Sequence, residues 1–212
     1  MRKANIFILA VLIISFAIGI YLYPQMPERM ASHWNVAGQV DGYMPKLWGL
    51  FLMPIISLAL FLLFIAIPRI DPLKANIEKF RKNFDIFIAI IMLFLLYIYL
   101  LTLFWSLGAR FNIIQLMSPA FAILFFYAGV LISNSKRNWF IGIRTPWTMS
   151  SEKVWNKTHS RGGKLFKAAG IICLLGAVFP DYAIWFVLVP VVAVAIYSVV
   201  YSYFLYSKEG KK

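Results

Sequence analysis

Two pairs of side chains in this sequence are of the types that transfer protons or bind metal ions. One pair is His33 and Asp41, and the other is Glu152 and His159. An imidazole beside a carboxylate can act as an acid–base pair or supply two ligands to a metal ion. The first pair has no third ligand to complete a metal site, and the second has no nucleophile partner or phosphate-binding glycine loop in evidence, so we predict no catalytic residue, no metal and no cofactor.

The second pair lies in a polar stretch, residues 138–170, that is rich in tryptophan and contains the run Arg144, Thr145, Pro146 and Trp147. Proline fixes its own φ and drives the preceding residue towards extended geometry. The run from Arg144 to Trp147 is therefore expected to be a rigid turn rather than a helix.

A helix is expected to follow, with Ser150 or Ser151 as its N-cap and Glu152 in its first turn. Helical spacing then aligns four side chains on one stripe, with Gly162 or Gly163 between them: Glu152, Trp155, His159 and Phe166. This stripe could be a docking face or a small acid–base site; the alternative is an interfacial helix with its tryptophans in the headgroups and its lysines in water. Structure or binding is favoured over catalysis.

The first pair lies in a shorter polar stretch, residues 24–46, which also contains Trp34, Asn35, Gly38 and Gly42. Gly38 and the Asp41-Gly42 dipeptide are expected to form turns that need positive φ or side-chain hydrogen bonds. His33 and Trp34 are expected to pack this loop against helix ends, which we prefer to a metal site.

The elements that position both stretches are hydrophobic. Of the 212 residues, 62% are hydrophobic and 14% charged, more apolar surface than one soluble core of this length buries, so we expect an integral membrane protein. A helix needs about 20 apolar residues to cross a bilayer. Six runs come close to this length: 6–23, 47–67, 84–107, 116–133, 165–179 and 184–206. The predicted fold is an all-α membrane protein with six transmembrane helices.

The basic residues predict the orientation. With the N-terminus in the cytoplasm, 18 of the 21 Lys and Arg residues fall inside, and those outside are Arg29, Lys46 and Arg110. Both termini are therefore expected to be cytoplasmic. The net charge of +13 needs no nucleic acid to explain it, and we predict the lipid bilayer, not nucleic acid, as partner.

We expect two units within one compact membrane domain. Residues 1–67 form a two-helix unit with extracellular loop 24–46, and residues 68–212 form a four-helix unit with cytoplasmic loop 134–164. No span has an ionisable residue near its middle, which argues against ion-coupled transport. The single cysteine, Cys173, excludes an intramolecular disulfide.

Both polar stretches resemble a known family. The segment GIRTPWTMSSEKVWNKTHSRGG, with Arg144, Trp155, His159 and Gly163 in register, resembles the signature of the SdpI family of bacterial membrane proteins. The segment MPERMASHWNVAGQVDGYMPK resembles a domain of unknown function commonly found at the N-terminus of the same proteins.

The family is named for an immunity protein that protects a cell from a secreted toxic peptide. The resemblance implies a multi-pass plasma-membrane protein of immunity or signalling, and in the namesake system it also implies a transcriptional repressor held at the membrane. We therefore expect the outer loop to meet a secreted peptide and the inner loop to meet a cytosolic repressor or other protein. The alternative is a membrane enzyme or a small-solute or lipid transporter that uses the polar residues of the loops.

Overall fold

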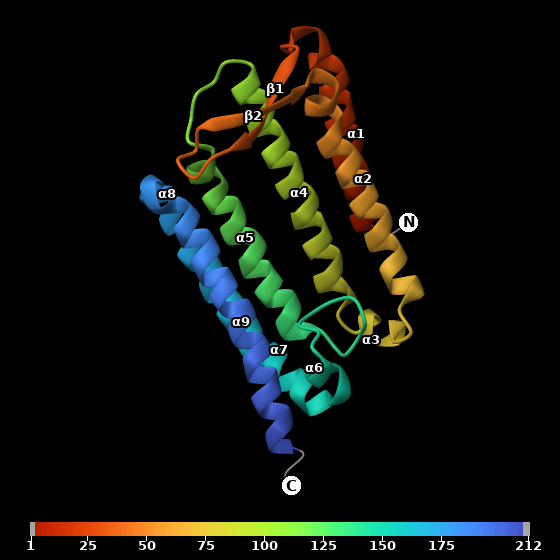
Figure 1. The fold of residues 1–212 in the computed structure, drawn as a ribbon. Helices are drawn as coiled ribbons and strands as arrows, with labels where there is room; N and C mark the ends of the chain where they lie inside the picture. The colour runs from red at the N-terminus through yellow and green to blue at the C-terminus, as the bar shows by residue number, and fades with distance from the viewer. Residues whose placement is uncertain (1–2, 210–212) are drawn as a thin grey trace.

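The computed structural model describes residues 3–209 as a bundle of long helices with a small hairpin at one end (Figure 1). The long helices are α1 (Lys3–Leu22), α2 (Lys46–Ile70), α4 (Arg81–Ser106), α5 (Ile113–Asn134), α7 (Glu152–Cys173) and α9 (Ala183–Glu209). Shorter elements connect them: α3 (Lys74–Glu78), α6 (Pro146–Ser150), α8 (Leu175–Val178) and the 3-10 turns η1 (Tyr23–Gln25) and η2 (Pro180–Tyr182). The beginning of α1 and the end of α9 both point away from the hairpin.

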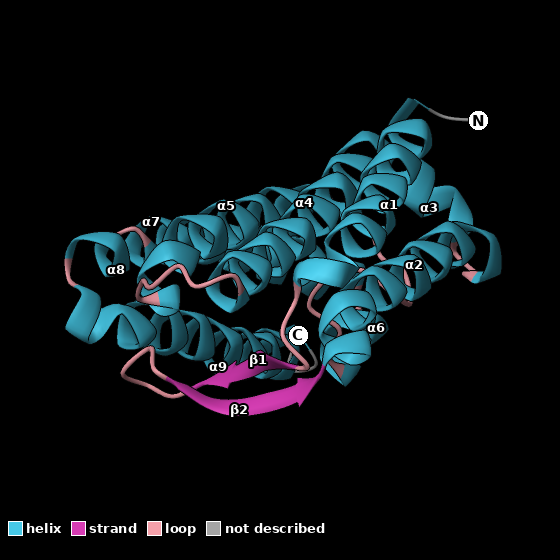
Figure 2. Cartoon of the chain, turned by 90° about the horizontal axis from the view of Figure 1, so that it is seen from above, coloured by secondary structure: helices cyan, strands magenta, loops and turns pink. Residues whose placement is uncertain are grey.

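The expectation of an all-α chain was wrong for the outer loop. Strands β1 (Arg29–Trp34) and β2 (Val40–Pro45) pair antiparallel, and Figure 2 shows this hairpin in magenta against the cyan helices. In β1, Met30 and Ala31 are buried. The Met30 side chain packs where α2 has Gly49, so closely that a Cβ on Gly49 would lie 2.7 Å from it. Burial against the helix ends thus supports a hairpin that two strands alone would not stabilise.

Five of the six expected spans are confirmed as helices long and apolar enough to cross a membrane. They are Lys3–Gln25, Lys46–Ile70, Arg81–Ser106, Ile113–Asn134 and Pro180–Glu209. The expected span 165–179 is not a separate helix. Its first part is the C-terminal part of α7, a helix that begins thirteen residues earlier in the polar loop, and α8 continues it after a break at Leu174. The first half of α7 is polar, so the helix as a whole is less hydrophobic than a membrane span.

Helices α5 and α7 pack through their smallest residues. A Cβ added to Gly129 would lie 2.5 Å from the carbonyl oxygen of Gly163, and one added to Gly170 would lie 2.6 Å from the backbone nitrogen of Phe126. Further along, Gly176 of α8 faces Ser118 of α5. Small residues let helix backbones approach closely, as membrane helices often do. The α7–α8 segment therefore follows α5 from one end to the other.

Candidate functional site

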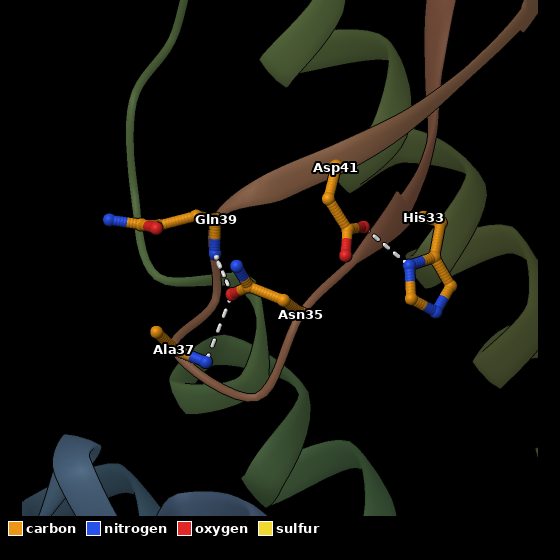
Figure 3. A network of polar contacts seen from close by, with 5 residues as sticks. All are labelled: His33, Asn35, Ala37, Gln39 and Asp41. Carbon is orange, nitrogen blue, oxygen red and sulfur yellow. Dashed lines mark hydrogen bonds and ion pairs between the residues drawn. The ribbon is translucent and has the colours of Figure 1, made fainter.

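The predicted site residues lie at the two ends of the bundle. At the end that carries the hairpin, called the outer end after its predicted orientation, Asn35 organises the tip of the hairpin (Figure 3). Its side-chain oxygen accepts hydrogen bonds from the backbone N–H groups of Ala37 and Gln39, each at 3.0 Å. Gly38 has φ +75° as expected, and a Cβ there would lie 2.6 Å from the side-chain oxygen of Asn112, the N-cap of α5. The hairpin tip is thus both a tight turn and a contact with the bundle.

His33 and Asp41 face each other across the two strands, with Nδ1 of His33 2.5 Å from Oδ1 of Asp41 (Figure 3). Both side chains are largely exposed. The expectation of a turn at Asp41-Gly42 was wrong, because both residues lie within β2. Gly42 is instead opposite His33, whose Cβ would lie 2.8 Å from a Cβ on Gly42. Among residues 3–209 no group of three or more His, Cys, Asp or Glu side chains gathers to hold a metal ion.

At the inner end, the loop between α5 and α6 is ordered by buried polar side chains. Asn138 is fully buried, and its amide donates to the carbonyl of Ile141 at 2.8 Å while its oxygen accepts from the N–H groups of Phe140 and Ile141. Asp71, just after α2, is also buried and accepts from the N–H of Trp139 at 2.9 Å. The loop is therefore bonded both to itself and to the first half of the chain.

His159 joins this loop to α7 with both of its ring nitrogens. Nδ1 lies 2.8 Å from the carbonyl oxygen of Trp155, which can only accept, and Nε2 lies 2.9 Å from the backbone nitrogen of Ile143, which can only donate. The proton must therefore sit on Nδ1, and the ring is the neutral tautomer. Burial lowers the pKa of His159 from 6.5 to about 4, although the bond to Trp155 opposes this shift. At neutral pH the imidazole is an uncharged structural group.

Trp155 completes the same buried unit. Its ring stacks on that of His159 with centroids 3.8 Å apart, and its Nε1 donates to the carbonyl of Ser135 at 3.1 Å. Glu152 is exposed on the first turn of α7, whereas Trp155 and His159 are buried. The expected stripe is therefore wrong at Glu152, and the described structure does not bring Glu152 and His159 together as an acid–base site. The glycine pair does not break the helix, and Gly163 packs against Ser133 of α5.

The run from Arg144 to Trp147 is the start of a short helix, which corrects the expectation of a turn without a helix. Pro146 is its first residue and Thr145 its N-cap, whose hydroxyl accepts from the N–H of Thr148 at 3.1 Å. Proline suits the first helical position because its missing N–H would have no partner there. The predicted cap of α7 is confirmed: Ser151 accepts from the N–H of Val154.

This short helix docks on α9. The Thr145 hydroxyl lies 3.0 Å from that of Ser202, and the rings of Trp147 and Tyr203 meet edge to face with centroids 5.1 Å apart. Arg144 is exposed, and its guanidinium donates to the carbonyl of Trp139. The tryptophan-rich loop is therefore a packed cap on the inner end of the bundle.

Sequence reasoning missed Asp71, Asn138 and Gly142. Asp71 follows a span and Asn138 lies in a loop. Both accept hydrogen bonds from backbone N–H groups, Asp71 from a residue far along the chain and Asn138 from residues close to it. The available signal was an acidic residue, Asp71, immediately after a span whose flanks are otherwise basic. Gly142 has φ +119°, and a Cβ there would lie 2.5 Å from Nε2 of His159. Nothing in the sequence shows that close approach.

The comparisons with known proteins match an N-terminal and a C-terminal part of the chain. Residues 134–202 match the SdpI/YfhL protein family, and residues 10–58 match a domain of unknown function, DUF1648. The chain is 30% identical over 210 residues to "Immunity protein SdpI" of Bacillus subtilis (strain 168), and the match covers 97% of each chain. No solved structure matches the chain.

Two glycines provide a matched test of the contact at His159. Gly142 and Gly108 both have positive φ, but a Cβ on Gly108 meets nothing within 4 Å. Gly108→Ala should cost only the backbone strain, about 1 to 3 kcal/mol. Gly142→Ala adds a clash with a buried ring and should lower the thermal unfolding temperature in detergent markedly more, and equal shifts would contradict the described contact.

The buried imidazole also predicts a pH dependence. Its pKa is lower in the folded protein than the ordinary 6.5, so the unfolded chain binds the proton more tightly and stability falls as pH falls from 6.5 towards 4. The full loss is about 3 kcal/mol. In thermal unfolding across this range, His159→Gln should remove that part of the pH dependence and His33→Gln should keep it. A His159→Gln variant with an unchanged pH slope would show that His159 is not buried in neutral form.

Proposed function

This chain belongs to the SdpI family of membrane proteins, and from that premise we propose that it is a plasma-membrane immunity protein that protects its cell from a secreted toxic peptide. The observation that carries the proposal is the match to an immunity protein along 97% of both chains. The fold is compatible with a protein that works by binding. The buried polar groups of the inner loop hydrogen-bond to other groups of the protein. The outer hairpin, in the proposed topology, presents polar side chains to the exterior.

The proposed topology has six crossings and two cytoplasmic termini. The α7–α8 segment supplies the sixth crossing, because it follows α5 at least from Ser133 to Ser118, a rise of about 22 Å at about 1.5 Å per residue. The distribution of Lys and Arg supports placing α3, α6 and both termini inside. In this arrangement the unit 1–67 carries the outer hairpin and the unit 68–212 carries the inner cap.

A cytosolic regulator, if the chain holds one, would meet the exposed face of α7 rather than the buried stack. Trp155 and His159 are inaccessible, whereas the opposite face of the same helix carries exposed basic side chains: Lys153, Lys157, Arg161 and Lys164. A row of cations favours an acidic partner surface. We propose that this row of cations is the surface that contacts the cytosolic partner.

Topology is tested with reporters. A reporter fused after Lys212 should report cytoplasm, and one inserted between residues 36 and 38 at the hairpin tip should report the exterior. A second fusion near Ala177 should also report the exterior if α7–α8 crosses. Hairpin and C-terminal reporters on one side would contradict the proposed topology, and an interior signal near Ala177 would remove the sixth crossing.

Immunity is tested by deleting the gene and exposing cells to secreted peptides of the same and neighbouring strains. The deletion strain should be killed by at least one such preparation, and the wild-type gene should restore survival. The immunity proposal fails if the deletion strain survives every preparation as well as its parent does.

A further inference from the structure

A cavity of about 310 Å³ lies beneath the outer hairpin and takes no part in the inner cap. The hairpin forms one wall through residues that include Ala31 and Trp34, and α2, α4, α5 and α9 form the others. Figure 1 shows the hairpin lying across the ends of α4 and α5. The wall is mainly apolar, with a few polar side chains such as Thr102 of α4.

Two side chains that line this cavity carry a buried polar atom without a hydrogen-bond partner. Three buried side-chain polar atoms of the described residues lack a hydrogen-bond partner, namely Trp34 Nε1, Tyr99 Oη and Thr158 Oγ1. Trp34 and Tyr99 both line the cavity, and the Tyr99 side chain is buried. Most buried donors in proteins are paired, because an unpaired one is costly. The hydroxyl of Tyr99 lies towards α1, where a Cβ on Gly19 would be 3.0 Å from it, so the indole N–H of Trp34 is the donor left for a guest that brings an acceptor.

We propose that this cavity is the binding site for an apolar side chain of the secreted peptide, with the indole N–H of Trp34 donating to a backbone carbonyl beside that side chain. An apolar cavity of about 150 Å³ binds benzene, so 310 Å³ suits one or two large side chains. A lipid chain would also fill apolar space, but the acceptor it brings is the ester carbonyl at its head, whereas a peptide brings a backbone carbonyl beside every side chain. The N–H is itself covered, so the guest enters by turning the indole and shifting the hairpin that carries it.

Such a shift has to loosen the contacts that hold the hairpin on the bundle. The exposed face of the hairpin carries the His33–Asp41 contact, and its inner face is held by the packing of Met30 on Gly49 and by an edge-to-face contact between Trp34 and Trp105, whose centroids are 6.2 Å apart. The cavity lies at the end of the bundle opposite the basic inner loop. In the proposed topology this end faces outward, and a secreted peptide arrives from that side. The inference rests on the proposed immunity function, because that function supplies the peptide.

The binding test uses photolabelling of the purified protein in lipid nanodiscs. The probe is the N-acetyl amide of trifluoromethyl-diazirinyl phenylalanine, and its counterpart is the same photoreactive ring as a toluene, which has no carbonyl. We expect the amide to label residues of the hairpin, α4 and α5 that line the cavity. Labelling confined to lipid-facing residues would overturn the proposal.

Two variants fill the cavity from different helices, Thr102→Phe on α4 and Met117→Trp on α5, so that one remains informative if the other misfolds. Each should lower amide labelling of the cavity at least about tenfold, the factor that corresponds to a single lost apolar contact of about 1.4 kcal/mol. Ala128→Phe fills a separate cavity of about 220 Å³ at the inner end and should leave labelling unchanged. Unfolding temperature and elution volume select the folded variants. Full labelling in folded filled variants would contradict the proposal.

Trp34→Phe tests the hydrogen bond. It should weaken labelling by the amide about fivefold, as expected for one lost hydrogen bond, and leave labelling by the toluene unchanged. Trp185→Phe, an exposed ring on α9, is the matched control. Equal labelling by both probes, insensitive to Trp34→Phe, would assign the cavity to a lipid chain and overturn the proposal.

Survival assays separate this inference from the function on which it rests. If Thr102→Phe blocks labelling yet restores full protection to the deletion strain, the cavity is not the peptide site and immunity stands. If the wild-type gene gives no protection, the immunity proposal fails, and so does the identification of the guest as a toxic peptide.

Discussion

The inner end of the bundle depends on one imidazole that is bonded to backbone at both nitrogens. His159 donates to its own helix and accepts from the loop that precedes that helix, so the ring can satisfy both partners only when it is neutral and holds its proton on Nδ1. Stacking on Trp155 fixes the plane of the ring. Gly142 has to be small and at positive φ because the ring lies against it. The position of the loop, and with it the short helix α6, follows from this arrangement.

The same loop connects the two halves of the chain. Asp71 at the end of α2 accepts from the loop, and Asn76 of α3 donates to the carbonyl of Arg137 at 2.9 Å. On the other side, Thr145 and Trp147 contact α9. The segment predicted to be a cytoplasmic loop is therefore a structural cap that joins the α2–α3 connection to the last helix, α9. The surfaces that we propose for partners are the exposed basic face of α7 and the outer hairpin with its cavity.

Much of the helical frame could be predicted, because length and apolar composition suffice to identify helices such as α2 and α4. The cap at Ser151 could also be predicted, because it depends on neighbouring residues. Other features depend on contacts between distant residues. The hairpin was missed because its strands are stabilised by packing on helix ends, and Glu152 was wrongly grouped with His159 because helical spacing alone does not show where a buried face ends. The expected span 165–179 is not a separate helix because one helix, α7, is polar in its first half and apolar in its second.

His159 is a neutral structural group with a fixed tautomer. The chain has two histidines, so a His33→Gln variant leaves His159 as the only source of imidazole signals. Nitrogen NMR of this variant, labelled at histidine and held at pH 7, should show a protonated Nδ1 and an unprotonated Nε2 that accepts a hydrogen bond. A protonated Nε2, an imidazolium, or averaging between the two tautomers would contradict the account.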